Sequence, residues 1–173
     1  METMENVGVP AIAEERHEEI VRIEIEREGS TELISIEIEE RDDLLIQVRE
    51  RVGLGPDIHL FERGGEHPLT RHSQGRRALR LVAHRHHRIE VRVRFEHRTA
   101  QANFSPATTV FKVLQWAVGK HGFALDALLA AKANLILPNS EAPLPRDAAI
   151  GTFTRHEEHT LVVDLTLKDF TNG

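Results

Sequence analysis

The sequence predicts an α+β protein made of two small domains of the same plan, joined end to end. Runs in which apolar and charged residues alternate occur in pairs, and this period of two indicates half-buried strands. Each pair is followed by an apolar stripe at helical spacing and then by two more strand-like runs. The whole order returns after about 75 residues, which favours two similar domains over one larger domain.

The composition is that of a globular protein, with 40% hydrophobic and 29% charged residues among 173. The net charge of −6 argues against a protein that binds nucleic acid by neutralising phosphates. No apolar run approaches the roughly 20 residues of a membrane-spanning helix, and the acidic start lacks the apolar segment of a secretory signal. Cysteine is absent, which removes disulfides, thiolate metal sites and cysteine nucleophiles. We therefore expect a cytoplasmic protein without membrane or nucleic-acid partners.

The first domain is predicted to start with a hairpin. Residues 1–18 lack periodicity, so a flexible segment is expected there. Apolar and charged residues alternate over 21–26 and again over 34–39, on either side of the turn Glu28-Gly29-Ser30. Two such runs across a short connection that contains glycine indicate an antiparallel hairpin.

A helix and two further strands complete this domain. Arg41-Asp42-Asp43 offers a carboxylate cap for a helix whose apolar residues recur at helical spacing up to Val52. Gly53-Leu54-Gly55-Pro56 predicts its end. Ile58 to Phe61 and Ala78 to Ala83 are the strand-like runs that follow.

The second domain repeats the order. Residues 89–96 and 100–104 form the second hairpin, and Thr108 or Thr109 can cap a helix over 110–118. The remaining predicted elements are an extra helical turn or two over Leu125–Lys132, a short strand Leu135–Leu137, a turn at 138–141 and a final strand Thr160–Leu167.

Burial of the apolar faces decides how these elements combine. The helix can lie across its hairpin, and the later strands can pair with the hairpin edges. A mixed sheet wrapped around one helix is the β-grasp arrangement, so we expect two tandem β-grasp domains, at 19–85 and 86–168. The short linker Arg85-His86-His87-Arg88 favours a fixed arrangement of the two, and residues 169–173 are left as a C-terminal tail.

Both halves resemble ubiquitin. In the first, the helix ends at Gly53-Leu54-Gly55-Pro56-Asp57, and a turn with Gly64-Gly65 follows the strand Ile58-His59-Leu60-Phe61. In the second, Leu135-Ile136-Leu137 and Thr160–Leu167 take the places of the short third strand and the final strand. Two fused ubiquitin-like domains in a cysteine-free chain ending in glycine resemble the BilA-like bacterial two-domain modifiers of an antiphage ubiquitin-like conjugation system.

The resemblance implies a modifier rather than an enzyme, and it implies no cofactor. Its partners would be an E1-like activating enzyme, an E2-like conjugating enzyme, a deconjugating protease and phage structural proteins as targets. The reacting group would be the carboxylate of Gly173. The partner enzymes would recognise the tail through Phe170, Thr171 and Asn172. The familiar tail ends in Arg-Gly-Gly, so the single glycine of Thr171-Asn172-Gly173 puts cross-reactivity with enzymes built for a double glycine in doubt.

The residues themselves also favour a reacting tail. Lys168 to Gly173 lack apolar periodicity and should extend into solvent. Glycine has no Cβ, so its carbonyl is unhindered and its backbone fits a narrow cleft. The thiols of the activating chemistry must belong to partners, because this chain has no cysteine.

Ubiquitin presents an apolar patch to its partners, and alignment puts Ile136, Val162 and Asp164 at that surface. The acidic Asp164 weakens the patch, and Ile136 can equally belong to the core.

The histidines raise a metal hypothesis. His84, His86 and His87 cluster at the linker, and His156-Glu157-Glu158-His159 resembles a ligand pair, but no third ligand is fixed by spacing. We expect solvated loop histidines and no metal site. No nucleophilic triad, phosphate loop or pair of catalytic carboxylates is recognisable.

Three functions stay open on the sequence: a conjugated modifier that reacts at Gly173, a tandem β-grasp scaffold or binding module that is never conjugated, and a sulfur carrier. The doubled architecture and the missing Gly-Gly argue against the third.

Overall fold

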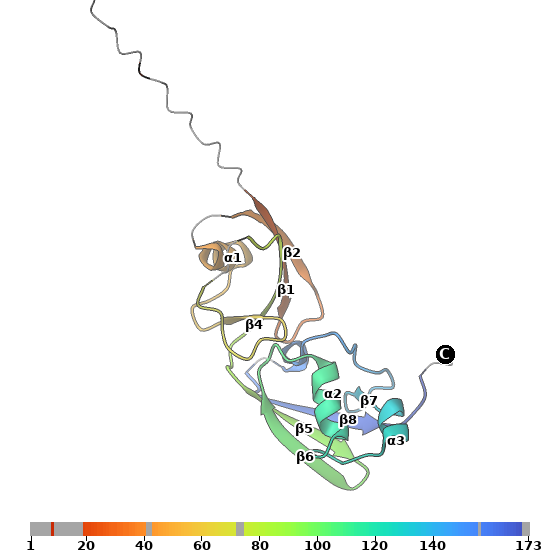
Figure 1. Ribbon diagram of the computed structural model, residues 1–173. Coiled ribbons are helices and arrows are strands. Elements are labelled where there is room, and N and C mark those ends of the chain that lie inside the picture. The colour runs from red at the N-terminus through yellow and green to blue at the C-terminus, as the bar shows by residue number, and fades with distance from the viewer. Residues whose placement is uncertain (1–7, 9–18, 41–42, 72–74, 156, 171–173) are drawn as a thin grey trace, which may run out of the picture.

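The computed structural model describes residues 8, 19–40, 43–71, 75–155 and 157–170, and it contains two four-stranded sheets (Figure 1). The strands of the first sheet are β1 (Ile20–Arg27), β2 (Ile34–Glu39), β3 (His59–Glu62) and β4 (Ala78–His84). Those of the second are β5 (Ile89–Phe95), β6 (Arg98–Phe104), β7 (Asn134–Ile136) and β8 (Thr160–Thr166). The helices are α1 (Leu44–Val52), α2 (Val110–Val118), α3 (Ala127–Lys132) and the 3-10 helix η1 (Ile150–Phe153).

The two sheets have the same topology. The first has the order β2-β1-β4-β3 and the second β6-β5-β8-β7. In each, the first two strands form an antiparallel hairpin, the last strand pairs in parallel with the first, and the short third strand pairs antiparallel with the last. A mixed sheet of this kind with one long helix is the β-grasp fold, so the predicted pair of ubiquitin-like domains is confirmed.

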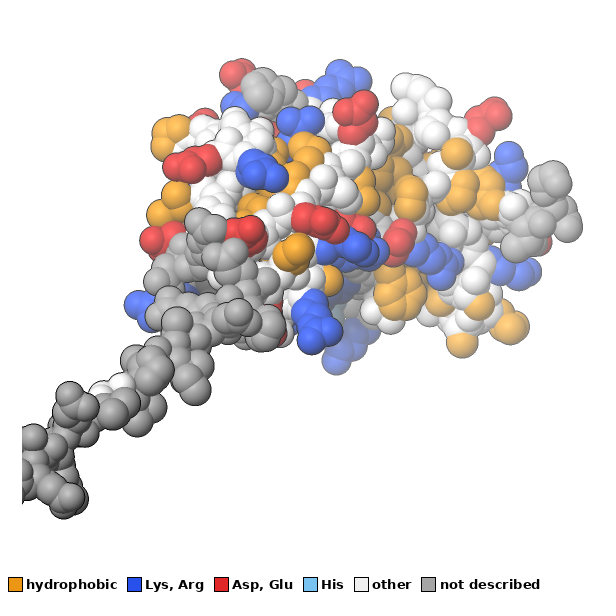
Figure 2. All heavy atoms as spheres, turned by 90° about the horizontal axis from the view of Figure 1, so that it is seen from above, with side chains coloured by type: hydrophobic (Ala, Val, Ile, Leu, Met, Phe, Trp, Pro, Cys, Tyr) orange, Lys and Arg blue, Asp and Glu red, His pale blue; other side chains and the backbone are white. Residues whose placement is uncertain are grey.

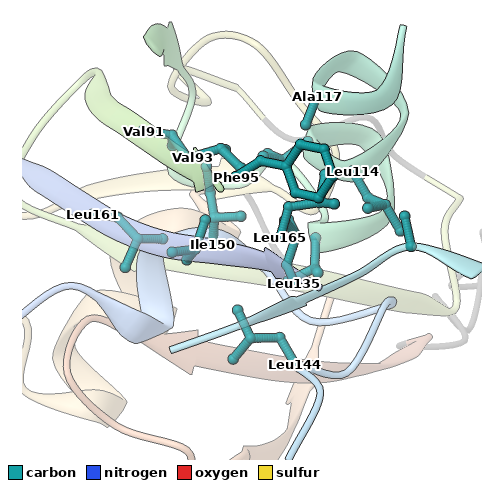
Figure 3. Close-up of a cluster of buried hydrophobic side chains, with 14 of the residues drawn as sticks. Val91, Val93, Phe95, Leu114, Ala117, Leu135, Leu144, Ile150, Leu161 and Leu165 are labelled. Atoms are coloured by element: carbon teal, nitrogen blue, oxygen red, sulfur yellow. The ribbon is translucent and has the colours of Figure 1, made fainter. Parts of the chain in front are cut away.

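Each core lies between the helix and one face of its sheet. In the first domain, alternate residues of β1 and β4 pack with Leu44 and Val48 of α1. In the second, alternate residues of β5 and β8 pack with α2, and Figure 3 shows Val93 and Phe95 directed toward Leu114 and Ala117. The strict alternation in the sequence therefore reflects a covered face and an open face of each sheet.

The helix ends agree only partly with the predicted caps. Thr109 caps α2 by accepting a hydrogen bond from the backbone N–H of Lys112 at 3.3 Å. Gly53 ends α1 in the left-handed conformation, with φ 70°. Asp43 stands at the start of α1, but its side chain makes no capping hydrogen bond and its φ is 69°, so the capping prediction is wrong for this residue. Arg41 and Asp42 lie outside the described residues.

The two domains are in direct contact. Phe61 and Val82 of the first sheet form one buried cluster with Ala107 and Ala149 of the second domain. Beside it, the Gly64 N–H donates to the Ala107 carbonyl at 2.7 Å. These contacts support the fixed arrangement that the short linker suggests.

The surface carries mixed charge. Acidic and basic side chains are interspersed over the face shown in Figure 2, so this face has no broad field of one sign. Among the described residues, no helix is both long enough and apolar enough to cross a lipid bilayer.

Candidate functional site

The tail leaves the second sheet from one of its two central strands. β8 lies between β5 and β7 and ends at Thr166, whose hydroxyl accepts a hydrogen bond from the Lys168 N–H at 3.1 Å. Lys168 and Asp169 are exposed and belong to no strand, and they follow β8 on the side of α3 (Figure 1). The predicted conjugation residue Gly173, together with Thr171 and Asn172, lies outside the described residues.

Phe170 is the one predicted tail-recognition residue that the structure describes. Its ring is half-buried, and the Lys168 ammonium lies 5.8 Å from the ring centroid. That distance is within the range of a cation–π contact. The start of the tail, Lys168 to Phe170 (the root of the tail), therefore makes a contact within itself, although it forms no part of the sheet.

The three predicted partner-surface residues come together on the open face of the second sheet. Ile136 is the register partner of Asp164, and Val162 lies two residues before Asp164 on the same strand. All three are half-buried, while their neighbours Leu135 and Val163 belong to the core. The alternative that Ile136 is a core residue is thus resolved in favour of the outer face.

The charge of Asp164 is matched by an arginine from the neighbouring strand. Arg94 donates to both carboxylate oxygens, at 2.6 and 2.9 Å, from the register position opposite Asp164 on β5. These hydrogen bonds raise the pKa of Arg94 further above its already high value. The paired charge leaves Ile136 and Val162 as an apolar strip next to a neutralised ion pair, which a partner can cover at a lower desolvation cost than a lone carboxylate.

In the first domain, the residues equivalent to Ile136 and Asp164 are buried instead of half-exposed. Phe61 pairs with Val82 as Ile136 pairs with Asp164, and each short strand also forms a bridge to a proline, Phe61 to Pro68 and Ile136 to Pro143. Phe61 and Val82 are completely buried by the second domain. The open face of the first sheet is therefore occupied, at its centre, by the chain itself.

Polar contacts surround this apolar centre. The Ser105 hydroxyl donates to the Gly65 carbonyl at 2.6 Å, and the Lys112 ammonium donates to Glu66 at 3.1 Å. Glu66 also accepts a hydrogen bond from Arg88 at 3.0 Å. The hydrogen bond from Lys112 and, to a smaller extent, the positive charges of Lys112 and Arg88 hold the pKa of the Glu66 carboxyl below its usual value. The buried centre with a polar rim is the usual anatomy of a specific interface.

His84 lies at the junction of the two domains and is completely buried, so the expectation of a solvated loop histidine is wrong for this residue. Its Nδ1 accepts from the His86 N–H at 3.0 Å, which leaves the proton on Nε2. Nε2 donates to the Thr154 hydroxyl at 2.8 Å, and that hydroxyl donates to the Gly151 carbonyl at 2.8 Å. The neutral ring is thus fully hydrogen-bonded across the junction.

Burial controls the pKa of the His84 imidazole. Desolvation lowers the pKa of His84 to about 4, and the nearby Glu28 carboxylate, 3.7 Å from Nε2, opposes the shift only in part. His84 therefore links the domains as an uncharged residue at neutral pH.

Four other histidines form two ring contacts. His59 and His87 have centroids 3.9 Å apart, and His86 and His159 have centroids 5.9 Å apart. Within the described ranges, no group of three or more His, Cys, Asp or Glu side chains is placed to hold a metal ion. His156 lies outside those ranges.

One feature of the sequence could have predicted the contact between the domains. Leu60 and Phe61 are adjacent apolar residues on β3, and Leu81, Val82 and Ala83 are adjacent on β4. Adjacent apolar residues on a strand indicate burial on both faces, whereas β5 alternates throughout and β1 alternates from Val21 onward. The pairing of His84 with Thr154, by contrast, has no local signal.

The comparisons with known proteins agree with this geometry. The sequence model of the family described as BilA ubiquitin-like domain 2 matches residues 90–168, from the start of β5 to just past the end of β8. No curated protein matches the chain. The second domain therefore matches the BilA ubiquitin-like family and the first domain has the same fold, which supports a BilA-like ubiquitin-like protein.

Proposed function

We propose that the chain is a protein modifier that is joined to target proteins through the carboxylate of Gly173. The observation that carries the proposal is the match to a BilA ubiquitin-like domain, which ends at Lys168. Residues 169–173, Asp-Phe-Thr-Asn-Gly, come after it. A modifier of this class needs such a short extension from a compact domain, because a partner's active site must enclose the terminal residues while the domain stays outside.

The chemistry consists of one adenylation followed by three acyl transfers. The Gly173 carboxylate attacks the α-phosphate of ATP, giving an acyl adenylate and releasing pyrophosphate. A thiolate of the E1-like enzyme then displaces AMP to form a thioester, which passes to a thiol of the E2-like enzyme. A lysine amine of the target finally attacks the thioester carbonyl, so that an isopeptide forms and the thiol leaves.

The composition of the chain agrees with this division of labour. Every thiol must come from a partner, because the chain has no cysteine. Glycine at the reacting end leaves the carbonyl unhindered for each attack. Lys168 and Asp169 are exposed, and the last strand has ended before them, so the sheet need not open for the tail to be used.

The proposal extends to the setting that the family implies. The chain would act in the bacterial cytoplasm as part of an antiphage system, with phage structural proteins as targets and a protease that removes the modifier. The open face at Ile136, Val162 and Asp164 is proposed as a partner surface of the second domain, since the equivalent face of the first domain is covered.

The direct experiment is incubation of the chain with an E1-like enzyme of a BilA-like system and ATP, followed by intact-mass analysis without reductant. We expect a thioester adduct that a thiol reductant cleaves. Deletion of Gly173 should abolish it, whereas Lys120→Arg, a change on the body of the second domain, should leave it intact. Absence of an adduct for the unaltered chain would contradict the proposal and favour a tandem β-grasp scaffold that is never conjugated.

A further inference from the structure

α3 has no counterpart in the first domain. Residues 53–58 alone connect α1 to β3, whereas residues 119–133, which include α3, connect α2 to β7. The two domains otherwise share the order and pairing of their strands. The additional helix is therefore an elaboration of the domain that carries the tail.

This helix is held at both ends but does not contribute to the core. Phe123 before it is 7% exposed and Ala133 after it is completely buried, and Asp126 caps it by accepting from the Leu129 N–H at 3.0 Å. None of its own residues is buried. Leu128 is 80% exposed and Leu129 is 37% exposed. A helix that is anchored at its ends and presents two leucines to solvent is placed for contact with another molecule.

α3 lies beside the root of the tail. Ala131 and Lys132 of the helix line a hollow of about 390 Å³ together with Arg146, Lys168 and Phe170. Figure 1 shows the same neighbourhood, with α3 next to the segment that follows β8. A partner that encloses the tail must therefore approach within reach of α3.

The charge around this hollow is mainly positive. Three cations, Lys132, Arg146 and Lys168, line it with a single carboxylate, that of Asp169. Arg146 is also held in place, because it donates to the Ala133 carbonyl at 3.2 Å and to Asn134 at 3.4 Å. Exposed leucines next to these cations are complementary to an apolar depression with carboxylates at its rim.

We propose that α3, with Lys132 and Lys168, is the surface by which the activating enzyme holds the modifier while the tail enters its active site. This inference rests on the proposed function. The enzyme would receive Leu128 and Leu129 in an apolar depression and would place acidic side chains against the two lysines. The first domain lacks this surface, which explains how the enzyme selects the domain that bears the tail.

An anionic membrane is the other kind of surface that leucines and cations can bind, and the structure favours the protein partner. The apolar contribution is two leucines on one six-residue helix, and the chain as a whole carries a net charge of −6. Such a chain is repelled by anionic lipid, and the leucines bury too little area to overcome the repulsion.

The test is ATP–pyrophosphate exchange by the E1-like enzyme with the full chain as the varied substrate. The double variant Leu128→Ser, Leu129→Ser and the double variant Lys132→Glu, Lys168→Glu should each raise KM for the chain about tenfold or more, with kcat within about twofold. The matched control is Leu33→Ser, Ile46→Ser, which removes two apolar side chains, 53% and 52% exposed, from the first domain and should leave KM unchanged. All variants should keep the far-UV circular dichroism spectrum of the unaltered chain.

The outcomes separate the two proposals. If the unaltered chain supports exchange and loses it on deletion of Gly173, but the α3 variants keep its KM, the docking inference is wrong and the modifier function stands. If the unaltered chain supports no exchange, both are wrong. Leucine-dependent co-sedimentation with phosphatidylserine vesicles, combined with an unchanged KM in the α3 variants, would assign α3 to membranes instead.

Discussion

Phe61 on β3 lies opposite Val82 on β4, and the second domain buries both side chains. The same two positions of the second sheet hold Ile136 and Asp164, which stay on the surface. One repeat has thus turned its open sheet face into an internal contact, and the other has kept that face accessible. The contact therefore covers this face in the first sheet, whereas the corresponding residues of the second sheet stay half-buried.

Truncation of Phe61 should destabilise the protein far more than truncation of its counterpart. Phe61→Ala leaves a cavity between the domains and should cost about 3 kcal/mol of unfolding free energy. Ile136→Ala, at the equivalent half-buried position, should cost about 1 kcal/mol or less. Urea denaturation of both variants checks this, and equal losses would show that the domain contact contributes little to stability.

The fold could be predicted because each β-grasp domain is encoded by local patterns. Val21, Ile23 and Ile25 alternate with charged residues, and the buried face of β1 consists of these three. Some element ends differ from the prediction: β3 starts at His59 rather than Ile58, and β7 covers Asn134–Ile136 rather than 135–137. Such shifts arise because the pairing strand, and not the sequence of the short strand alone, decides where a ladder begins.

Gly151 is a position where Pro106 of the same domain and His84 of the first domain leave no room for a side chain. A Cβ there would lie 2.8 Å from the Pro106 Cβ, 2.9 Å from the Pro106 carbonyl oxygen and 3.0 Å from His84 Cδ2. Gly151→Ala should therefore cost about 1–3 kcal/mol of unfolding free energy through overpacking. Gly55→Ala is the control, since its Cβ would meet only the movable carboxylate of Asp57. Thermal unfolding should separate the two, and similar melting temperatures would refute the close packing around Gly151.

His84 should make the stability of the protein depend on pH. Its pKa is about 4 in the folded protein and 6.5 in the unfolded chain, so the unfolded state binds more protons between these values. Stability should accordingly fall as pH drops from about 6.5 to 4, by at most about 3 kcal/mol from this residue.

The matched variant for this prediction is His84→Asn, which cannot titrate but keeps an acceptor for the His86 N–H. It should lose the part of the pH dependence that lies between pH 6.5 and 4, although its stability at pH 7 is lower. Urea unfolding curves collected across this range provide the comparison. An unchanged slope in the variant would show that other groups cause the acid sensitivity.

Ile136 should matter for partners but not for folding. Ile136→Asp adds a carboxylate on the open face directly opposite Asp164, so a partner that covers this strip must desolvate an additional charge. We expect slower transfer from the E2-like enzyme to target, with the unfolding free energy within about 1 kcal/mol of the unaltered chain. Glu37→Gln, on the exposed edge strand of the first sheet, is the control. Equal transfer rates for the three proteins would mean that no partner binds this face during transfer.

The sequence located Ile136, Val162 and Asp164 but not their setting. Their shared face follows from strand register, which the run Leu161-Val162-Val163 does not reveal because it lacks alternation. The pairing of Asp164 with Arg94 also depends on which strand lies beside β8, and 70 residues separate the two in the chain. Likewise, nothing near α3 in the sequence indicates that Leu128 and Leu129 remain outside the core, because exposed and buried leucines look alike in a short helix.

Peptide mapping of modified proteins tests the central claim most directly. Trypsin should cut after Lys168, so every conjugated target would retain residues 169–173, Asp-Phe-Thr-Asn-Gly, on the amine of one of its lysines. We expect this remnant, linked through the Gly173 carbonyl, on target lysines in cells that express the chain with its E1-like and E2-like enzymes. Recovery of the same five residues only as a free peptide, with no lysine carrying them, would contradict the account.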